Sequence, residues 1–535
     1  MQIIYEAFLD AAARVPDNGF VCIPPRPGRD YDPDGIEYTY AQVRAQVQQH
    51  QEAYRRAGYG LGNRVALLLE NRPQVYFHWL ALNALGASIV PINPDYKAAE
   101  VAYLLTNSEA DLVVALSHRI QGLQQIIAEH MPHRVAVVPE GPPETLPPPR
   151  RPPQAGRPER STEVALQYTS GTTGNPKGCM LSNAYFFYAG ERYINAGGVM
   201  AMAYGQERMY NPLPLFYANT LAISNPAMIL KGGTLIIPDR FHPSTFWQDI
   251  ATTGATLFHY LGIVPPVLLK QAPVPDERQH RLKFGYGAGI NPVDHRAFEQ
   301  RFNVPLCEGW GMVEMAICAV DNYEPRKLDT RSFGQPLTGV EFRIVDGNDQ
   351  EVSVGTEGEL TVRRAGTDSR LGFFSGYFNN AEATAEAWRG GWFHTGDMVR
   401  RDESGTYYFV DRIKNIIRRS AQNIAAVEIE AMLQAHEAIA EVAVIAAPDE
   451  IREEEVFACI VLNPDYKPVR ETAEAIIAWS QTQMSYFKVP GWLLFMERLP
   501  LTSTQKMQKA RIFSPGEDPR QAPGAMDFRD RKQRR

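Results

Sequence analysis

Residues 168–178 read YTSGTTGNPKG, a stretch in which hydroxyl side chains and glycines lead up to a lysine. Glycine lets successive backbone N–H groups turn toward one point, so such a loop can cradle phosphate oxygens. The P-loop pattern GxxxxGK[ST] does not fit, because Lys177 follows Pro176 and precedes Gly178. The dinucleotide fingerprint GxGxxG fails too, since GYGAGI and GWGMVE both miss the third glycine. The stretch therefore indicates phosphate chemistry of another kind.

Short apolar runs alternate with helical stretches through most of the chain before residue 340. The runs are RVALLLE, SIVPI, DLVVAL and RVAVVP, followed later by GGTLIIP, ATLFHYL and LKFGYGAG. This alternation is typical of an α/β fold with a mostly parallel sheet covered on both faces. Thr39 is a candidate cap for a helix that ends near Gly58. Residues 75–92 predict a buried helix and then a strand, because Gly86 and Pro91 interrupt the apolar run.

Three domains are predicted from changes of pattern along the chain. Residues 1–411 form a large N-terminal domain, and residues 412–514 form a small α+β domain. Residues 515–535 have little to bury and end in RDRKQRR, so a disordered, solvated tail is expected. The proline-rich residues 141–160 are expected to form an extended surface connector.

Composition excludes several classes of protein. The chain has 535 residues, is 44% hydrophobic and carries a formal net charge of −7, so no basic field indicates nucleic-acid binding. Its five cysteines are scattered without a CxxC pair, which argues against a disulfide framework or a zinc site and suits the cytoplasm. The N-terminus has no signal-peptide pattern, and no membrane span is expected.

The stretch YTSGTTGNPKG closely resembles the signature of the adenylate-forming superfamily, which comprises acyl-CoA synthetases, adenylation domains of peptide synthetases and firefly luciferase. Further motifs of that family follow in the same order: GWGMVEM (309–315), GWFHTGD (391–397), VDRIKNIIRRSAQNIAAVEIE (410–430) and LPLTSTQKMQK (499–509). The chain looks most like the carnitine/crotonobetaine–CoA ligase branch. The resemblance implies a large domain of mixed, mostly parallel sheets with flanking helices, and a small C-terminal domain that rotates about a hinge.

The resemblance also assigns roles to residues of the site. It implies that Trp310 stacks on adenine and that Asp397 and Arg412 bind the ribose hydroxyls. Glu314 would hold Mg2+, and Lys506 would complete the active site as the catalytic lysine. The implied ATP- or AMP-binding residues are Thr169, Ser170, Gly171, Thr172, Thr173, Gly174, Lys177, Gly287, Ala288, Gly289, Trp310, Gly311, Met312, Asp397 and Arg412. The implied acyl pocket is Tyr217, Ala218 and Asn219, the hinge is Lys414, and the CoA channel is Arg418, Ser420 and Ala421.

The implied function is that of an acyl-CoA synthetase using ATP, Mg2+ and CoA, with a small or medium carboxylic acid as substrate. An amino acid is disfavoured, because Tyr217 stands where amino-acid-activating relatives place an aspartate after the PLF segment. Several residues depart from the family pattern and bear on the thiol acceptor more than on the adenylation: Val313, Tyr217, Ala421, Gln422 and Gln505. Two alternatives stay open, a ligase that loads a phosphopantetheine carrier protein and a non-catalytic nucleotide- or acyl-binding relative.

Overall fold

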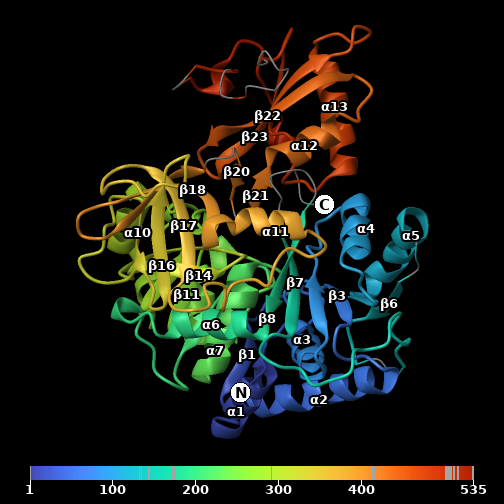
Figure 1. The fold of residues 1–535 in the computed structure, drawn as a ribbon, viewed down its shortest axis with the longest axis vertical. Helices are drawn as coiled ribbons and strands as arrows, with labels where there is room; N and C mark the ends of the chain where they lie inside the picture. The colour runs from blue at the N-terminus through green and yellow to red at the C-terminus, as the bar shows by residue number, and fades with distance from the viewer. Residues whose placement is uncertain are drawn as a thin grey trace. The chain divides into compact units, whose positions relative to one another are not determined.

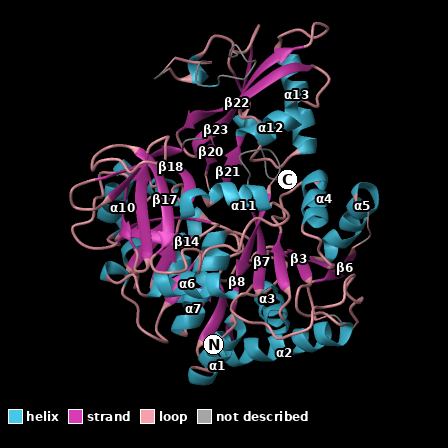
Figure 2. Cartoon of the chain, in the orientation of Figure 1, coloured by secondary structure: helices cyan, strands magenta, loops and turns pink. Residues whose placement is uncertain are grey.

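Strands and helices alternate along the chain in the predicted α/β manner (Figure 1, Figure 2). A computed structural model describes residues 2–131, 133, 135–142, 145–169, 176–290, 292–412, 416–420, 422–500, 509, 512–514 and 517–532. The chain divides into two compact units. The large unit comprises Met1–Pro94, Leu104–Gln167 and Gly178–Asp411, and the small unit comprises Asp95–Tyr103, Tyr168–Lys177 and Arg412–Arg535.

A six-stranded sheet in the order β6-β5-β3-β4-β7-β8 contains the first predicted apolar runs. Its strands are β3 (Arg64–Leu68), β4 (Ser88–Pro91), β5 (Leu112–Ala115), β6 (Ala136–Pro139), β7 (Glu163–Thr169) and β8 (Lys177–Ser182). β3 pairs in parallel with both β4 and β5, and every residue of β3 and β5 is buried. Apolar runs without alternation are what strands covered on both faces require, so the predicted parallel sheet is confirmed.

A thirteen-stranded sheet carries most of the candidate site. In sheet order its strands are β16 (Val340–Val345), β17 (Gly358–Arg364), β18 (Phe393–Arg401), β19 (Tyr407–Arg412), β15 (Ser332–Pro336), β14 (Ala316–Asp321), β13 (Leu306–Met312), β12 (Phe284–Gly287), β11 (Leu257–His259), β9 (Arg208–Tyr210), β10 (Thr234–Ile236), β1 (Gly19–Ile23) and β2 (Ile36–Thr39). The run β11-β12-β13 is parallel, whereas β13-β14 and β16-β17-β18 are antiparallel. Parallel strands end at the same edge, so the loops after β11 and β12 and the end of β13 lie close together.

Two helices before the small C-terminal domain, α2 (Tyr40–Ala57) and α3 (Gln74–Leu85), end at the glycines predicted from the sequence, Gly58 and Gly86. The other helices described in this region are α1 (Ile4–Arg14), α4 (Ala98–Asn107), α5 (Ile120–His130), α6 (Asn183–Ile194), α7 (Asn225–Lys231), α8 (Phe246–Thr253), α9 (Val264–Leu269), α10 (Pro292–Phe302) and α11 (Ala381–Ala387). Thr39 forms a capping box with Gln42, and Gly58 ends α2 at φ 90°. Among the described residues, no helix combines the length and the apolar character that crossing a membrane would require.

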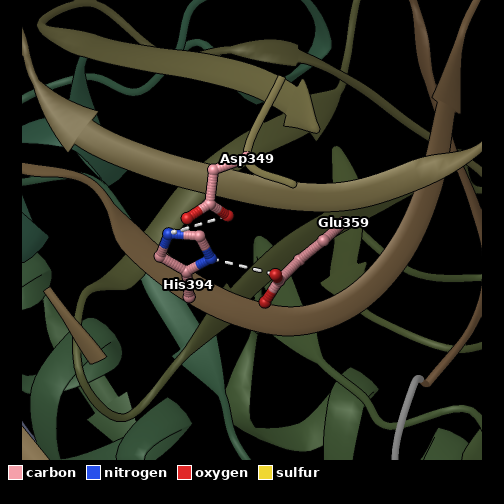
Figure 3. Close-up of side chains that lie close together, drawn as sticks. All are labelled: Asp349, Glu359 and His394. Atoms are coloured by element: carbon pink, nitrogen blue, oxygen red, sulfur yellow. Dashed lines mark hydrogen bonds and ion pairs between the residues drawn. The ribbon is translucent and has the colours of Figure 1, made fainter. Parts of the chain in front are cut away.

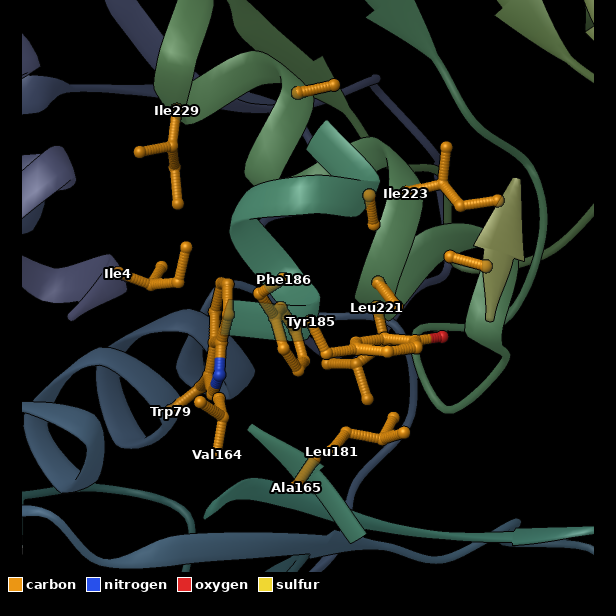
Figure 4. Close-up of a cluster of buried hydrophobic side chains, with 14 of the residues drawn as sticks. Ile4, Trp79, Val164, Ala165, Leu181, Tyr185, Phe186, Leu221, Ile223 and Ile229 are labelled. Carbon is orange, nitrogen blue, oxygen red and sulfur yellow. The ribbon is translucent and has the colours of Figure 1, made fainter. Parts of the chain in front are cut away.

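The core of the large unit forms where α1, α3 and α6 meet the six-stranded sheet (Figure 4). Trp79 of α3 and Phe186 of α6 lie with ring centroids 5.8 Å apart, and both are buried. Ile4 of α1 and Val164 of β7 close the same cluster (Figure 4). Residues 75–92 therefore form the predicted buried helix and strand, with Gly86 at φ 77° ending α3.

The proline-rich connector contains no helix or strand among its described residues within 141–160, as predicted. It is tied to the large unit through its backbone. Asn63 donates from Nδ2 to the carbonyl of Arg151 at 2.9 Å, and the Gln154 N–H donates to the carbonyl of Leu61 at 2.8 Å. The connector is thus a fixed surface segment of the large unit.

The small unit builds a separate sheet in the order β21-β20-β23-β24-β25, with β22 paired to β23. The elements are β20 (Ile416–Arg419), β21 (Gln422–Ala425), α12 (Ala426–Leu433), β22 (Ile439–Asp449), β23 (Glu453–Leu462), α13 (Arg470–Gln483), β24 (Trp492–Phe495) and β25 (Met526–Asp527). Ile476 and Ile477 of α13 and Val456 of β23 belong to its own hydrophobic core. The predicted α+β character of this region is confirmed.

The C-terminal segment differs from the expected disordered tail. Within the described residues 517–532, β25 pairs antiparallel with β24, and Phe528 is fully buried in the core of the small unit. Arg529 pairs with Asp449 at 3.0 Å, and Arg531 with Glu474 at 3.2 Å. Arg529 also pairs with Asp527 at 2.7 Å. The partners that dock the segment, Asp449 and Glu474, lie 80 and 57 positions away from Arg529 and Arg531, so no local pattern indicated them.

Candidate active site

The loop after β12 is held by a buried carboxylate that the sequence reasoning missed. Glu308 of β13 accepts hydrogen bonds from the Gly289 N–H at 2.8 Å and the Ile290 N–H at 3.3 Å through Oε2. Its other oxygen accepts from the Tyr260 hydroxyl at 2.5 Å. Burial raises the pKa of Glu308. This carboxylate fixes the backbone at Gly289, directly after the predicted nucleotide-binding residues Gly287 and Ala288.

Two glycines of the site are required by close packing. A Cβ at Gly287 would lie 2.4 Å from the carbonyl oxygen of Tyr260 in the neighbouring chain segment. A Cβ at Gly311 would lie 1.9 Å from the carbonyl oxygen of Ala316, across the β13–β14 hairpin. Both positions exclude a side chain, and Gly289 at φ 82° also has a backbone that suits glycine.

Trp310 and Asp397 meet in the structure, although their motifs are far apart in the sequence. The indole Nε1–H of Trp310 donates to Oδ2 of Asp397 at 3.0 Å. Trp310 is 6% exposed and Asp397 is 2% exposed, so the hydrogen bond is buried. The rings of Phe333 and Phe342 lie 5.9 and 5.5 Å from Trp310 and hold it in place. The structure thus joins the residues assigned to adenine and ribose.

Asp397 is held by a hydrogen-bond network from β17 and β18. Glu359 accepts the Gly396 N–H at 3.0 Å through one oxygen and faces Nδ1 of His394 at 2.9 Å through the other (Figure 3). The Thr395 hydroxyl donates to the carbonyl of Leu360 at 2.7 Å and accepts the Asp397 N–H at 3.0 Å. Glu359 and Thr395 therefore fix the backbone on both sides of Gly396.

Asp349, Glu359 and His394 are near enough to hold a metal ion together, with ligand atoms all within 4.8 Å of one another (Figure 3). An arginine already supplies the positive charge there. Arg389 contacts Glu359 at 3.1 Å and Asp349 at 3.4 Å. We therefore interpret this cluster as an ion-pair network that supports the segment before Asp397.

Glu314 lies in the turn between β13 and β14 with its side chain 5% exposed. Its Oε1 accepts a hydrogen bond from the Tyr377 hydroxyl at 2.8 Å, and its carbonyl accepts the Phe374 N–H at 2.7 Å. Burial and the nearby Glu314 carboxylate raise the pKa of Tyr377, so the hydroxyl stays protonated as a donor. A positioned carboxylate is a ligand that Mg2+ favours, so this residue fits the expected metal.

Two residues of α6 hold the turn that carries Glu314 through hydrogen bonds to its backbone. Arg192 donates from Nη1 to the carbonyl of Met315 at 2.9 Å, and Tyr185 donates its hydroxyl to the carbonyl of Val313 at 2.7 Å. Val313 stands where the family pattern has a threonine, so its side chain offers no hydroxyl. The contact with Tyr185 holds the backbone at this position.

The last residue of the predicted acyl pocket, Asn219, is the first residue of a π-helix, η3 (Asn219–Ser224). Asn219 contacts Nδ1 of His259 at 2.7 Å, and the other ring nitrogen lies 2.8 Å from the Tyr193 hydroxyl. Since the Asn219 Oδ1 accepts, Nδ1 carries the proton and Nε2 accepts from the tyrosine. Burial lowers the pKa of His259 to about 3, so the ring is neutral. Tyr217 and Ala218 directly precede this turn.

The remaining predicted site residues belong to the small unit. Thr169 and Lys177 lie on either side of the phosphate loop, where the Thr169 hydroxyl donates to the Lys177 carbonyl at 3.5 Å. Arg418 lies in β20, and Ser420 follows it at φ 55°. Arg412 ends β19. The other predicted residues fall outside the described ones: Ser170, Gly171, Thr172, Thr173, Gly174, Lys414, Ala421 and Lys506.

Comparisons with known proteins identify the family of the chain. Residues 8–378 match the AMP-binding enzyme family, and residues 428–506 match the AMP-binding enzyme C-terminal domain. The chain is 28% identical over 491 residues to a crotonobetaine/carnitine–CoA ligase of Citrobacter koseri, covering 89% of this chain and 93% of that one. A similar ligase from Proteus mirabilis is also 28% identical, over 492 residues.

Solved structures share the fold. An o-succinylbenzoate CoA synthetase from Bacillus subtilis superposes with a TM-score of 0.80 at 20% identity, covering 94% of this chain and 97% of that one. An amide bond synthetase from Marinactinospora thermotolerans gives 0.78 at 24% identity, covering 96% and 99%. The family match spans more than half of the chain. The protein therefore belongs to the AMP-binding, adenylate-forming enzyme family, the superfamily that includes the acyl-CoA synthetases.

Proposed function

We propose that this protein is an ATP- and Mg2+-dependent acid–thiol ligase that forms an acyl adenylate and transfers the acyl group to CoA. One observation carries the proposal. Trp310 and Asp397, which lie 87 positions apart and to which the family motifs assign adenine and ribose, meet through a 3.0 Å hydrogen bond. Family membership and the similarity to CoA ligases over 89% of the chain support the same reaction class.

In the first step a carboxylate oxygen attacks the α-phosphorus of ATP. The new O–P bond forms as the bond to the bridging oxygen breaks, and pyrophosphate leaves with the electron pair. Trp310 would contact adenine and Asp397 would accept the ribose hydroxyls. Glu314 would hold Mg2+, which when bound neutralises phosphate charge. The loop after Thr169 and the lysine at 506 would supply the remaining donors and cation, as predicted from the family motifs.

In the second step the thiol sulfur attacks the acyl carbon. A C–S bond forms, the bond between the acyl carbon and the AMP oxygen breaks, and the thiol proton passes to solvent. The small C-terminal domain would rotate near Lys414, withdraw Lys506 and present residues 418–421 to the thiol. One site then serves two reactions in turn.

The substrate class is a small or medium carboxylic acid. Asn219 contacts a neutral His259, so this contact offers no charge to pair with a substrate ammonium. That chemistry supports the expectation that the acid is not an amino acid. All five cysteines are buried free thiols, which suits the cytoplasm as the proposed compartment.

The test is pyrophosphate release from Mg-ATP across a panel of carboxylic acids, each run with CoA, with a phosphopantetheinylated carrier protein, and without an acceptor. Acid-dependent release that accelerates with CoA and collapses in Lys506→Ala supports the ligase. Release that accelerates only with the carrier protein supports the alternative acceptor. No release with any acid, together with ATP binding in a titration, would favour a non-catalytic binding protein.

A further inference from the structure

Three buried charged side chains meet in the interior of the small unit, and the partly exposed Arg452 lies 3.5 Å from one of them, Glu455. The three buried residues are Arg419 at the end of β20, Glu455 of β23 and Lys532 of the C-terminal segment. Side chains of Glu455 and Lys532 are fully buried, and that of Arg419 is 3% exposed. Arg419 Nε lies 2.8 Å from Glu455, and the Lys532 ammonium pairs with the same carboxylate. A buried carboxylate depends on such donors, because water cannot replace them.

The C-terminal segment is docked so that its lysine reaches this carboxylate. The Phe528 N–H donates to the Gly491 carbonyl at 2.8 Å, and Gln481 donates to the Arg531 carbonyl at 2.7 Å. Gly491 also leaves room for the cluster, since a Cβ there would lie 2.4 Å from Cγ of Glu455. Lys532 itself donates to the Phe487 carbonyl at 3.3 Å.

Residues 418–420 are bound by the strand segment that carries Glu455 and by the residues just before it. The Arg418 N–H donates to Oε2 of Glu454 at 2.5 Å, and the Ser420 N–H donates to the carbonyl of Arg452 at 2.9 Å. The side chain of Arg419, between them, is held by Glu455. Residues 452–455 thus fix this segment through its backbone and through one buried side chain.

We propose that Lys532 is a positioning residue for the thiol step, acting through Glu455 and Arg419 on residues 418–420. The inference rests on the proposed function, which assigns those residues to the CoA channel. Without the lysine, Glu455 loses a donor in a buried site, so the carboxylate and its partner Arg419 shift together. Adenylate formation does not use this segment and is expected to continue.

The charged groups that face the Lys532 ammonium are Glu455, Arg419 and Arg452. Burial and the two arginines lower the pKa of Lys532 to about 7, despite the opposing effect of Glu455. The charge of the cluster therefore changes near neutral pH. A role in the thiol step would appear as a change in the KM for CoA through about pH 7.

The test compares full-length wild type with Lys532→Met and with Lys467→Met, an exposed lysine of the same unit. Lys532→Met is expected to raise the KM for CoA about tenfold, within the range of network mutations, and to remove its pH dependence. Pyrophosphate release without CoA should stay within about twofold of wild type, because residues 418–420 take no part in the first step of the proposed reaction. The Lys467→Met control should match wild type in both assays.

Two results would overturn the positioning role. One is a KM for CoA that is the same in Lys532→Met and Lys467→Met. The other is an equal loss of rate in both steps together with a lower unfolding midpoint. Lys532 would then stabilise the fold and have no separate role in the thiol step. Failure of the proposed function can be distinguished, because the rate of pyrophosphate release by the wild-type protein would then be the same with and without CoA.

Discussion

The hydrogen bond between Trp310 and Asp397 gives a quantitative test of the nucleotide site. Trp310→Phe keeps an aromatic ring but removes the N–H that donates to Asp397 at 3.0 Å. A buried hydrogen bond to a charged acceptor contributes about 1.5–3 kcal/mol. If about 1.4 kcal/mol of this acts on nucleotide binding, the Kd for AMP rises about tenfold.

A double-mutant cycle separates this effect from general damage. The Kd for AMP is measured by titration calorimetry for wild type, Trp310→Phe, Asp397→Asn and the double variant. The two changes are expected to be non-additive by about 1 kcal/mol, because both remove the same interaction. Trp392→Phe, which alters a tryptophan outside this pair, serves as the matched control. Additivity within about 0.3 kcal/mol would refute the reasoning, since the indole would then not position the carboxylate.

Three further predictions follow from other contacts. Glu359→Gln weakens the support of Gly396 and should raise the KM for ATP about threefold to tenfold, with kcat less affected, in steady-state kinetics. Phe528→Ala should lower the free energy of unfolding of the small unit by about 3–5 kcal/mol in urea, and a loss below about 1 would show that the C-terminal segment does not complete the core. Lys532 has a folded pKa of about 7, below its unfolded value, so the unfolded state binds more protons above that pH. Stability should therefore rise with pH from about 7 to 10 in wild type relative to Lys532→Met, and parallel pH curves would contradict this.

Local signals allowed the sequence to predict much of the fold. The helix from Thr39 to Gly58 was predictable because its cap and its terminating glycine are its own residues. The fully buried strands were predictable because a strand covered on both faces needs an unbroken apolar run. The site residues Trp310 and Asp397 came from family resemblance, and only the folded chain shows that they touch.

The polar contacts that hold the site could not be predicted in this way. No local pattern indicates Glu308, Arg192 or His259, because each binds a residue far away in the sequence. Glu308 and Arg192 also bind backbone atoms, which leave no trace in the identity of their partners. A charged residue inside an apolar strand was the one available sign for Glu308. The C-terminal segment was predicted wrongly for the same reason, because Arg529 and Lys532 meet Asp449 and Glu455 only after folding.

The π-helical turn at Asn219–Ser224 has a consequence for comparing substrate preferences. The Asn225 N–H bonds back to Thr220, so this turn holds one residue more than an α-helical turn would. A relative that lacks one residue here would return to α-helical pairing, and the side chains before the deletion would turn by about 100° around the axis. In the proposed acyl pocket, a single gap in an alignment would then exchange which side chain faces the acid. Substrate assignments carried by aligned position alone would fail at this turn, even between relatives that share every nucleotide-binding motif.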